Sequence, residues 1–330
     1  MRTIVEHNDR LAFHPGYYIQ EIQEELGLTQ EDFAKRLDTT PKNLSLLIRG
    51  EQSLSIDMAV KIARYLGTSI ELWLNLQRSY DCMLGEMKSE QMMKEEEKVS
   101  KLLDYDFFKT QYEMPPTLSY LEEGTKERKI EEMRRFLGLS SLTILEKRDI
   151  AVSFRSTEAE LTKEDLVRAN VMVQIAINRS LKAEAPKYLR KHLSEALPDI
   201  LSLQGEPEAC TGKIKEILRA CGIIYQVIPE MEGAKISGAT KKLGDHVLLM
   251  MNERCLKTNA FWFTLFHEIG HIMHGDYGMS IEGETGEKEE KANRFAEKMM
   301  KKRAEDLYQQ EQFYEGLRMI SDDFLAEGRP

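Results

Sequence analysis

The chain has 330 residues, of which 42% are hydrophobic and 31% are charged, and this balance is typical of a soluble globular protein rather than a disordered or membrane one. Its length predicts two or three domains, and its longest apolar runs fall far short of the roughly 20 residues that span a bilayer. The net charge of −10 argues against indiscriminate coating of nucleic acid, although a small domain could still place cations locally. The N-terminal sequence MRTIVEHNDR lacks the apolar core of a signal peptide, and the four cysteines form no CxxC pair. We therefore expect a cytoplasmic protein with reduced thiols and no membrane partner.

Turn and capping signals divide residues 1–82 into short amphipathic helices, which predicts an all-α N-terminal domain. Pro15 opens the first helix, Thr29 caps the second, and Thr40 precedes a third that has Pro41 in its first position. The five helices are predicted to begin near residues 15, 30, 41, 56 and 69.

The second and third helices have the pattern of a helix-turn-helix unit. Small Ala34 lies where the two helices would cross, and Asp38 occupies the turn, where a residue with positive φ is needed and Asp is tolerated. The exposed polar residues of the third helix suit a recognition helix that meets base edges and phosphates. Because residues 1–80 are not basic overall, these patterns alone leave a purely structural packing module open. The candidate DNA-facing residues are Gln30, Lys42, Asn43, Ser45 and Arg49.

The segment from residue 15 to residue 77, with LTQEDFAKRL, NLSLLIRGEQSLSIDMAVKIARYLG and IELWLNLQ, resembles lambda-type helix-turn-helix repressors of the antitoxin class that partner HigB-like toxins. The resemblance implies binding of palindromic operator DNA as a homodimer. It also adds Pro41 to the DNA-facing positions, where a polar residue is often found instead.

Residues 83–205 carry no chemical motif and are predicted to form a helical middle region. The charge run GEMKSEQMMKEEEKVS at its start is typical of a solvated helical face or a linker. We leave open whether this region only separates the two other domains or also controls access to a site.

Residues 206–330 have an α+β pattern, and they include the sequence HEIGH. Strands are predicted over 223–229 and 246–251, and helices from 260 and from 287 to about 310. Two histidines four residues apart, His267 and His271, share one helical face and can bind a single Zn²⁺, while Glu268 would lie beside the open metal position as general base.

A third zinc ligand is needed, and acidic residues downstream of HEIGH offer one. Glu289 is the favoured ligand and Glu290 the second choice. His274 is a weaker alternative, because a residue three positions after His271 lies partly off the helical face that His267 and His271 share. Asn293, four residues after Glu289, could hydrogen-bond a ligand imidazole.

The motifs ISGAT, FWFTLFHEIGHIMHG and ExxANRFA together resemble the ImmA/IrrE family of zinc metallopeptidases. This resemblance implies a zincin-like fold with zinc bound by His267, His271 and Glu289, and with Glu268 as the catalytic acid/base. It also implies cleavage of a helix-turn-helix repressor, in another chain or in this one. The oxyanion-stabilising group is unassigned, with Tyr277, His246 and Arg254 as candidates.

Three hypotheses for function follow from the sequence. The first is a DNA-binding regulator fused to a zinc metallopeptidase. The second is a non-enzymatic, antitoxin-like repressor whose zinc domain is structural or sensory. The third is a scaffold that only neutralises a toxin.

Overall fold

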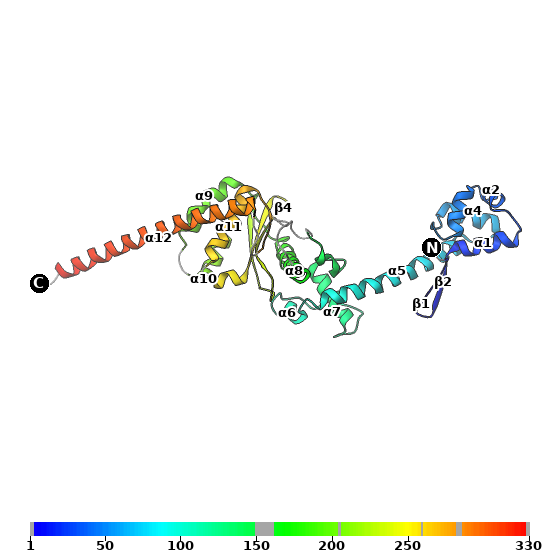
Figure 1. Ribbon diagram of the computed structural model, residues 1–330, viewed down its shortest axis with the longest axis horizontal. Helices are drawn as coiled ribbons and strands as arrows, with labels where there is room; N and C mark the ends of the chain where they lie inside the picture. Colours follow the sequence, from blue (N-terminus) through cyan, green and yellow to red (C-terminus); the bar gives the residue numbers. More distant parts are fainter. Residues whose placement is uncertain (1–2, 149–161, 204–205, 259, 282–285, 328–330) are drawn as a thin grey trace. The chain divides into compact units, whose positions relative to one another are not determined.

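The computed structural model describes residues 3–148, 162–203, 206–258, 260–281 and 286–327 (Figure 1). The chain divides into two compact units, Met1–Glu95 and Glu96–Pro330. None of the described helices is long and apolar enough to cross a membrane.

The first unit begins with a β-hairpin that the sequence analysis missed, so the prediction of an all-α N-terminal domain was wrong at this point. Strands β1 (Ile4–His7) and β2 (Arg10–Phe13) pair antiparallel. The two residues between them, Asn8 and Asp9, have positive φ angles of 51° and 57°, which the type I′ turn of a two-residue hairpin requires. Each strand has only four residues, so the alternation of apolar and polar residues in its sequence is too short to indicate a strand. The hairpin is stabilised by packing of buried Val5 and Ala12 on the fifth helix.

Five helices follow, and the predicted starts of all five are confirmed to within one residue. They are α1 (Pro15–Glu25), α2 (Gln30–Arg36), α3 (Pro41–Ile48), α4 (Ile56–Leu66) and α5 (Ile70–Ser100). The side chains of Thr29 and Thr40 accept hydrogen bonds from the backbone N–H three residues later, as N-caps do. Asp38 has a φ of 49°, as the predicted turn requires.

Helix α5 runs well beyond residue 82, where the N-terminal domain was predicted to end. The charge run of residues 85–100 continues it, because no proline interrupts this stretch and its single glycine is tolerated. The predicted domain boundary at residue 82 therefore falls inside a continuous helix, and the two compact units divide after Glu95 instead.

The second unit is built on a four-stranded mixed sheet. Its strands are β3 (Ile223–Ile228), β4 (Ile236–Leu243), β5 (His246–Asn252) and β6 (Gly278–Ile281), in the order β3-β5-β4-β6. β3 and β5 are parallel, and the other pairs are antiparallel. β3 and β5 were predicted, whereas β4, which has two lysines and one glycine among its eight residues, and the very short β6 were not.

Helices cover both faces of this sheet (Figure 1). One face packs, through Tyr225 and Leu249 among others, against α9 (Arg190–Leu201), α10 (Pro207–Ala220) and α11 (Phe261–His274). Alternate strand residues such as Leu248 and Met250 are also buried and point to the opposite face.

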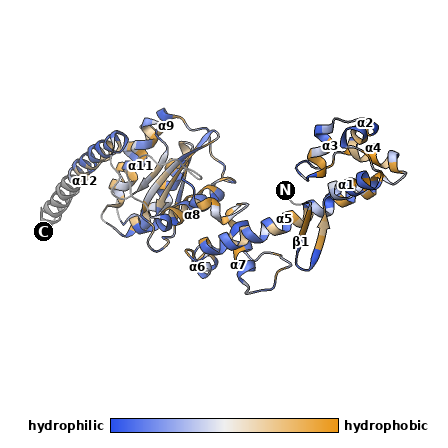
Figure 2. Cartoon of the chain, turned by 45° about the vertical axis from the view of Figure 1, so that its right-hand side comes forward, coloured by the Kyte–Doolittle hydropathy of each residue, from blue (hydrophilic) through white to orange (hydrophobic). Residues whose placement is uncertain are grey.

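That opposite face is covered by α8 (Lys163–Ser180), which contacts β3 and β5. Most residues of α8 are buried, among them apolar Val171, Met172 and Ile175. Figure 2 colours parts of this helix as hydrophobic. It belongs to the region predicted as a helical middle segment, so part of residues 83–205 belongs to the core of the α+β unit rather than to a separate linker.

The remaining described elements of the second unit are all helices. They are α6 (Tyr105–Thr110), α7 (Lys126–Leu137), the short 3-10 helices η1 (Leu142–Glu146) and η2 (Glu253–Lys257), and α12 (Glu287–Glu327). At the end of α5, buried Glu96 accepts hydrogen bonds from Arg134 (3.0 Å) and from the backbone N–H of Leu142 (2.7 Å). These bonds tie the end of α5 to α7 and η1.

Candidate metal centre and nucleic-acid interface

Helices α11 and α12 bring together the three residues that the sequence analysis proposed as metal ligands. His267 Nε2 lies 3.0 Å from His271 Nε2 and 3.1 Å from Glu289 Oε2, and His271 Nε2 lies 3.3 Å from Glu289 Oε1. All three residues are buried, and one donor atom from each lies within 4.8 Å of the others. We call this group the His-His-Glu cluster.

The second nitrogen of each imidazole is held by an oxygen acceptor. His267 Nδ1 lies 2.9 Å from Asn293 Oδ1, which is the contact predicted for Asn293. His271 Nδ1 lies 3.2 Å from Asp276 Oδ2, and the other oxygen of Asp276 lies 2.8 Å from Lys288 Nζ. Nδ1–H donation of this kind fixes the tautomer that leaves Nε2 as a metal-binding lone pair.

Asp276 was missed by the sequence analysis, although a local signal exists. Gly275 ends α11 in the left-handed conformation with φ 71°. The chain turns back at this point, so the residue after Gly275 lies beside the last turn of the helix. A glycine-acid pair directly after HEIGHxxH could therefore have indicated a partner for the second histidine.

The donor atoms suit zinc. Two imidazole nitrogens and one carboxylate, all buried and close together, are the protein ligands of many catalytic zinc sites, which keep a fourth position for water or substrate. Burial alone would raise the pKa of Glu289, but the imidazoles of His267 and His271, when both of their nitrogens carry hydrogen, donate to this carboxylate, outweigh burial and hold its pKa below the ordinary value. Glu289 is therefore available as a charged ligand.

Two glycines allow the close packing around the cluster. A Cβ atom at Gly270, inside HEIGH, would lie 3.2 Å from the Cα of Ala292, so α11 and α12 cross closely at this point. A Cβ atom at Gly238, in β4, would lie 2.4 Å from Glu268 Oε1. Glu268 is fully buried, and the bare backbone of β4 leaves it the space it occupies.

The alternative ligands have other partners. His274 Nδ1 lies 2.6 Å from the carbonyl oxygen of Gly270, and the exposed Glu290 pairs with Arg294 at 2.9 Å. Neither belongs to the His-His-Glu cluster.

The three candidate oxyanion-stabilising residues also differ in their surroundings. His246 Nδ1 lies 2.9 Å from the carbonyl oxygen of Pro186, and Arg254 pairs with Glu230 at 3.3 Å. Tyr277 is half-buried and packs against the apolar core that includes Phe266 and Ile269, so the contacts of the described residues assign the oxyanion-stabilising role to none of the three.

In the first unit, the predicted DNA-facing residues gather at the start of α2 and along α3. Pro41 and Lys42 are exposed in the first turn of α3, and Gln30 is half-buried at the start of α2. Asn43 donates a hydrogen bond to Thr39 Oγ1 at 3.1 Å, which aligns its side chain at the helix start.

Arg49 makes more contacts within the chain than the sequence suggested. Its guanidinium donates to both carboxylate oxygens of Glu51, at 3.0 and 3.1 Å, and to Ser45 Oγ at 2.7 Å. Because a carboxylate already compensates its charge, we expect Arg49 to contribute less to phosphate binding than the exposed Lys42.

Comparison with known proteins gives matches for the N-terminal unit. Residues 19–73 match the sequence profile of the helix-turn-helix family. Virulence-associated protein I of Dichelobacter nodosus is 31% identical over 80 residues, which are 24% of this chain and 74% of that protein. The uncharacterized HTH-type transcriptional regulator YddM of Escherichia coli is 36% identical over 73 residues, which are 22% of this chain and 78% of that protein.

Solved structures include similar chains. PA4674 of Pseudomonas aeruginosa, solved in complex with its operator DNA, is 25% identical over 24% of this chain and 88% of its own, with a TM-score of 0.23. An addiction module antidote protein of a HigA family from Coxiella burnetii is 27% identical over 29% of this chain and 95% of its own, with a TM-score of 0.24. The predicted helix-turn-helix domain is thus confirmed by the sequence comparisons, while the resemblance of the second unit to ImmA/IrrE peptidases stays a prediction.

Proposed function

Because the chain belongs, through its N-terminal unit, to the helix-turn-helix family, we propose that it binds operator DNA and regulates transcription. The match over residues 19–73 is the observation that carries this proposal. Exposed Pro41 and Lys42 at the start of α3, with Asn43 beside them, supply the groups that would enter the major groove. An antitoxin-like role, a HigB-like toxin partner and a homodimer on a palindromic site extend this proposal, and they are supported by the sequence resemblance.

The substitution Lys42→Ala tests the DNA interface. We expect weaker binding and a salt dependence whose slope falls by about one, because one phosphate contact is lost. The measurement is fluorescence anisotropy at several salt concentrations, with a duplex that the wild-type chain selects from a random library. Lys88→Ala is the control, because it removes the same charge from an exposed position on α5 that lies outside residues 19–73 of the helix-turn-helix match. If both variants bind like the wild type, the proposed recognition helix is wrong.

We also propose that the second unit is a zinc metallopeptidase, and the His-His-Glu cluster supports this proposal. Zinc held there would supply Lewis acidity to a peptide carbonyl and to water. Glu268 would take the proton from the attacking water and pass it to the leaving nitrogen. Asn293 and Asp276 would keep the two imidazoles in place. The substrate we propose is a helix-turn-helix repressor, in another chain or in this one.

Zinc content of the purified full-length chain tests the metal site. We expect about one zinc per chain by elemental analysis in the wild type and its loss in His267→Ala. His274→Ala is the matched control, since it removes an imidazole from the same helix outside the cluster, and it should keep the zinc. Zinc-free wild type would contradict the peptidase proposal and leave the DNA-binding proposal intact.

Asp276→Ala tests whether Asp276 orients the proposed metal ligand His271. We expect zinc affinity to fall about 10- to 100-fold, because His271 loses the acceptor that orients it. Competition with a chromophoric chelator measures this change. Asp276→Asn should recover part of the affinity, since its amide oxygen still accepts a hydrogen bond. Asp245→Ala, which removes an exposed acid paired with Lys187, should leave zinc affinity unchanged. Equal affinity in all variants would show that Asp276 has no such role.

A further inference from the structure

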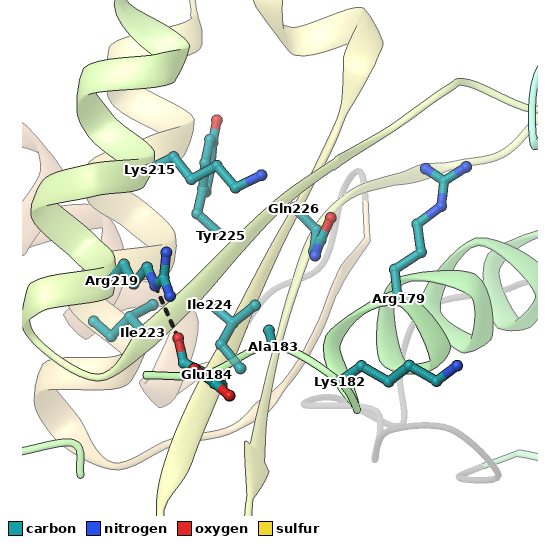
Figure 3. A pocket seen from close by; sticks show the side chains of 10 residues that line it. All are labelled: Arg179, Lys182, Ala183, Glu184, Lys215, Arg219, Ile223, Ile224, Tyr225 and Gln226. Atoms are coloured by element: carbon teal, nitrogen blue, oxygen red, sulfur yellow. Dashed lines mark hydrogen bonds between the residues drawn. The ribbon is translucent and has the colours of Figure 1, made fainter. Parts of the chain in front are cut away.

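A cavity that contains no residue of the His-His-Glu cluster lies beside β3, an edge strand of the sheet (Figure 3). Its volume is about 430 Å³, within the range of about 300–1,000 Å³ typical of small-molecule sites. Arg179 and Lys182 line it from α8 and the residues just after that helix, and Lys215 and Arg219 line it from α10. Ile224 and Gln226 of β3 contribute an apolar surface and an amide between the two groups of cations.

The charge around this cavity is strongly unbalanced. Four of its lining residues are cations and only Glu184 is an acid, although acids outnumber bases in the chain by 56 to 46. Among the described residues, no carboxylate lies within 4.0 Å of any of these four cations. Many other cations of this unit, such as Arg128 and Arg134, pair with a carboxylate within that distance.

The two arginines are held in place by backbone carbonyl groups rather than by acids. Arg219 Nε donates to the carbonyl oxygen of Glu184 at 2.8 Å, and Arg179 Nη2 donates to the carbonyl oxygen of Tyr112 at 3.2 Å. These bonds orient each guanidinium without neutralising it. A guanidinium has five N–H donors, so each retains donors that suit the oxygens of a phosphate group.

We propose that this cavity binds a small organic anion that carries phosphate groups. Oriented guanidinium groups form charge-assisted, bidentate hydrogen bonds with phosphate oxygens. The limited volume of the cavity and the apolar surface of Ile224 favour a small molecule with an organic part over an extended acidic peptide along the β3 edge. The proposal depends on neither DNA binding nor zinc, and it assigns a ligand site to the second unit.

Isothermal titration of the full-length chain with ADP, without magnesium, tests this site. We expect the wild type to bind ADP saturably. The affinity should be about tenfold or more lower in the double variant Lys215→Gln/Arg219→Gln, because charge-assisted hydrogen bonds are lost. The control Lys191→Gln/Lys213→Gln removes the same charge from exposed lysines that do not line the cavity, and it should bind ADP like the wild type. Repeating the titration on His267→Ala excludes ADP bound at the His-His-Glu cluster.

Three results would overturn the proposal. The first is no saturable binding of ADP or of inorganic pyrophosphate by the wild type. The second is an equal loss of affinity in the two double variants, which would indicate attraction by overall charge only. The third is binding of a polyglutamate peptide without binding of ADP, which would assign the β3 edge to an acidic peptide instead.

Discussion

Glu268→Gln is expected to lower the rate of peptide-bond cleavage by about 10²- to 10⁴-fold, which is the usual contribution of a general acid/base. Zinc and DNA binding should persist, because the cluster ligands and the first unit are unchanged. Glutamine is nearly isosteric with glutamate, so it can occupy the buried space against Gly238. The carboxylate that accepts a proton is lost, and the side-chain volume is kept.

The measurement is the rate of cleavage of a co-expressed helix-turn-helix repressor, or of the chain itself, followed by mass spectrometry. Glu290→Gln is the matched control, since this exposed neighbour of Glu289 pairs with Arg294 and should leave the rate unchanged. Cleavage that persists unchanged in Glu268→Gln would exclude the proposed mechanism. Zinc binding without cleavage in the wild type would favour the non-enzymatic hypothesis, in which zinc is structural or sensory.

Gly16→Ala is expected to lower the free energy of unfolding of the first unit by about 1–3 kcal/mol or more. An added Cβ atom would lie 2.0 Å from the carbonyl oxygen of Leu47 and 2.9 Å from that of Ile48. Both contacts are with the backbone of α3, so a side-chain rotation cannot relieve them. α1 and α3 would have to separate, and the recognition helix would shift with them.

Chemical denaturation followed by the fluorescence of Trp73 measures this effect, in a Trp262→Phe background that leaves one tryptophan in the first unit. Gly85→Ala is the control. Apart from the adjoining backbone of α5 itself, no atom lies within 4 Å of an added Cβ atom at Gly85, so alanine should stabilise the helix by about 0.5–1 kcal/mol. A Gly16→Ala variant as stable as the wild type would show that α1 and α3 are less closely packed than described.

Several features of this protein could be predicted from the sequence because their signals are local. The side chains of Thr29 and Thr40 cap their helices by accepting a hydrogen bond from the backbone N–H three residues later, and Asp38 adopts the positive φ that its turn requires. His267 and His271 lie on one face of α11 because four residues make about one helical turn. Glu289 and Asn293 were placed from the family resemblance and from chain length together, and the structure brings both to the histidines.

Other features depend on contacts between residues far apart in the chain, and only the tertiary structure decided them. β4 and β6 are strands because they pair with each other and β4 pairs with β5, while their own sequences carry little alternation. The close approach of Gly238 to Glu268 exists only once β4 lies beside α11. The basic cavity exists only because α8 and α10 meet β3 from opposite faces, which places Arg179 near Arg219. The physical reason is the same in each case: a strand, a close backbone contact or a charge cluster is stable through its partners, and the sequence around one residue does not specify which distant partner it meets.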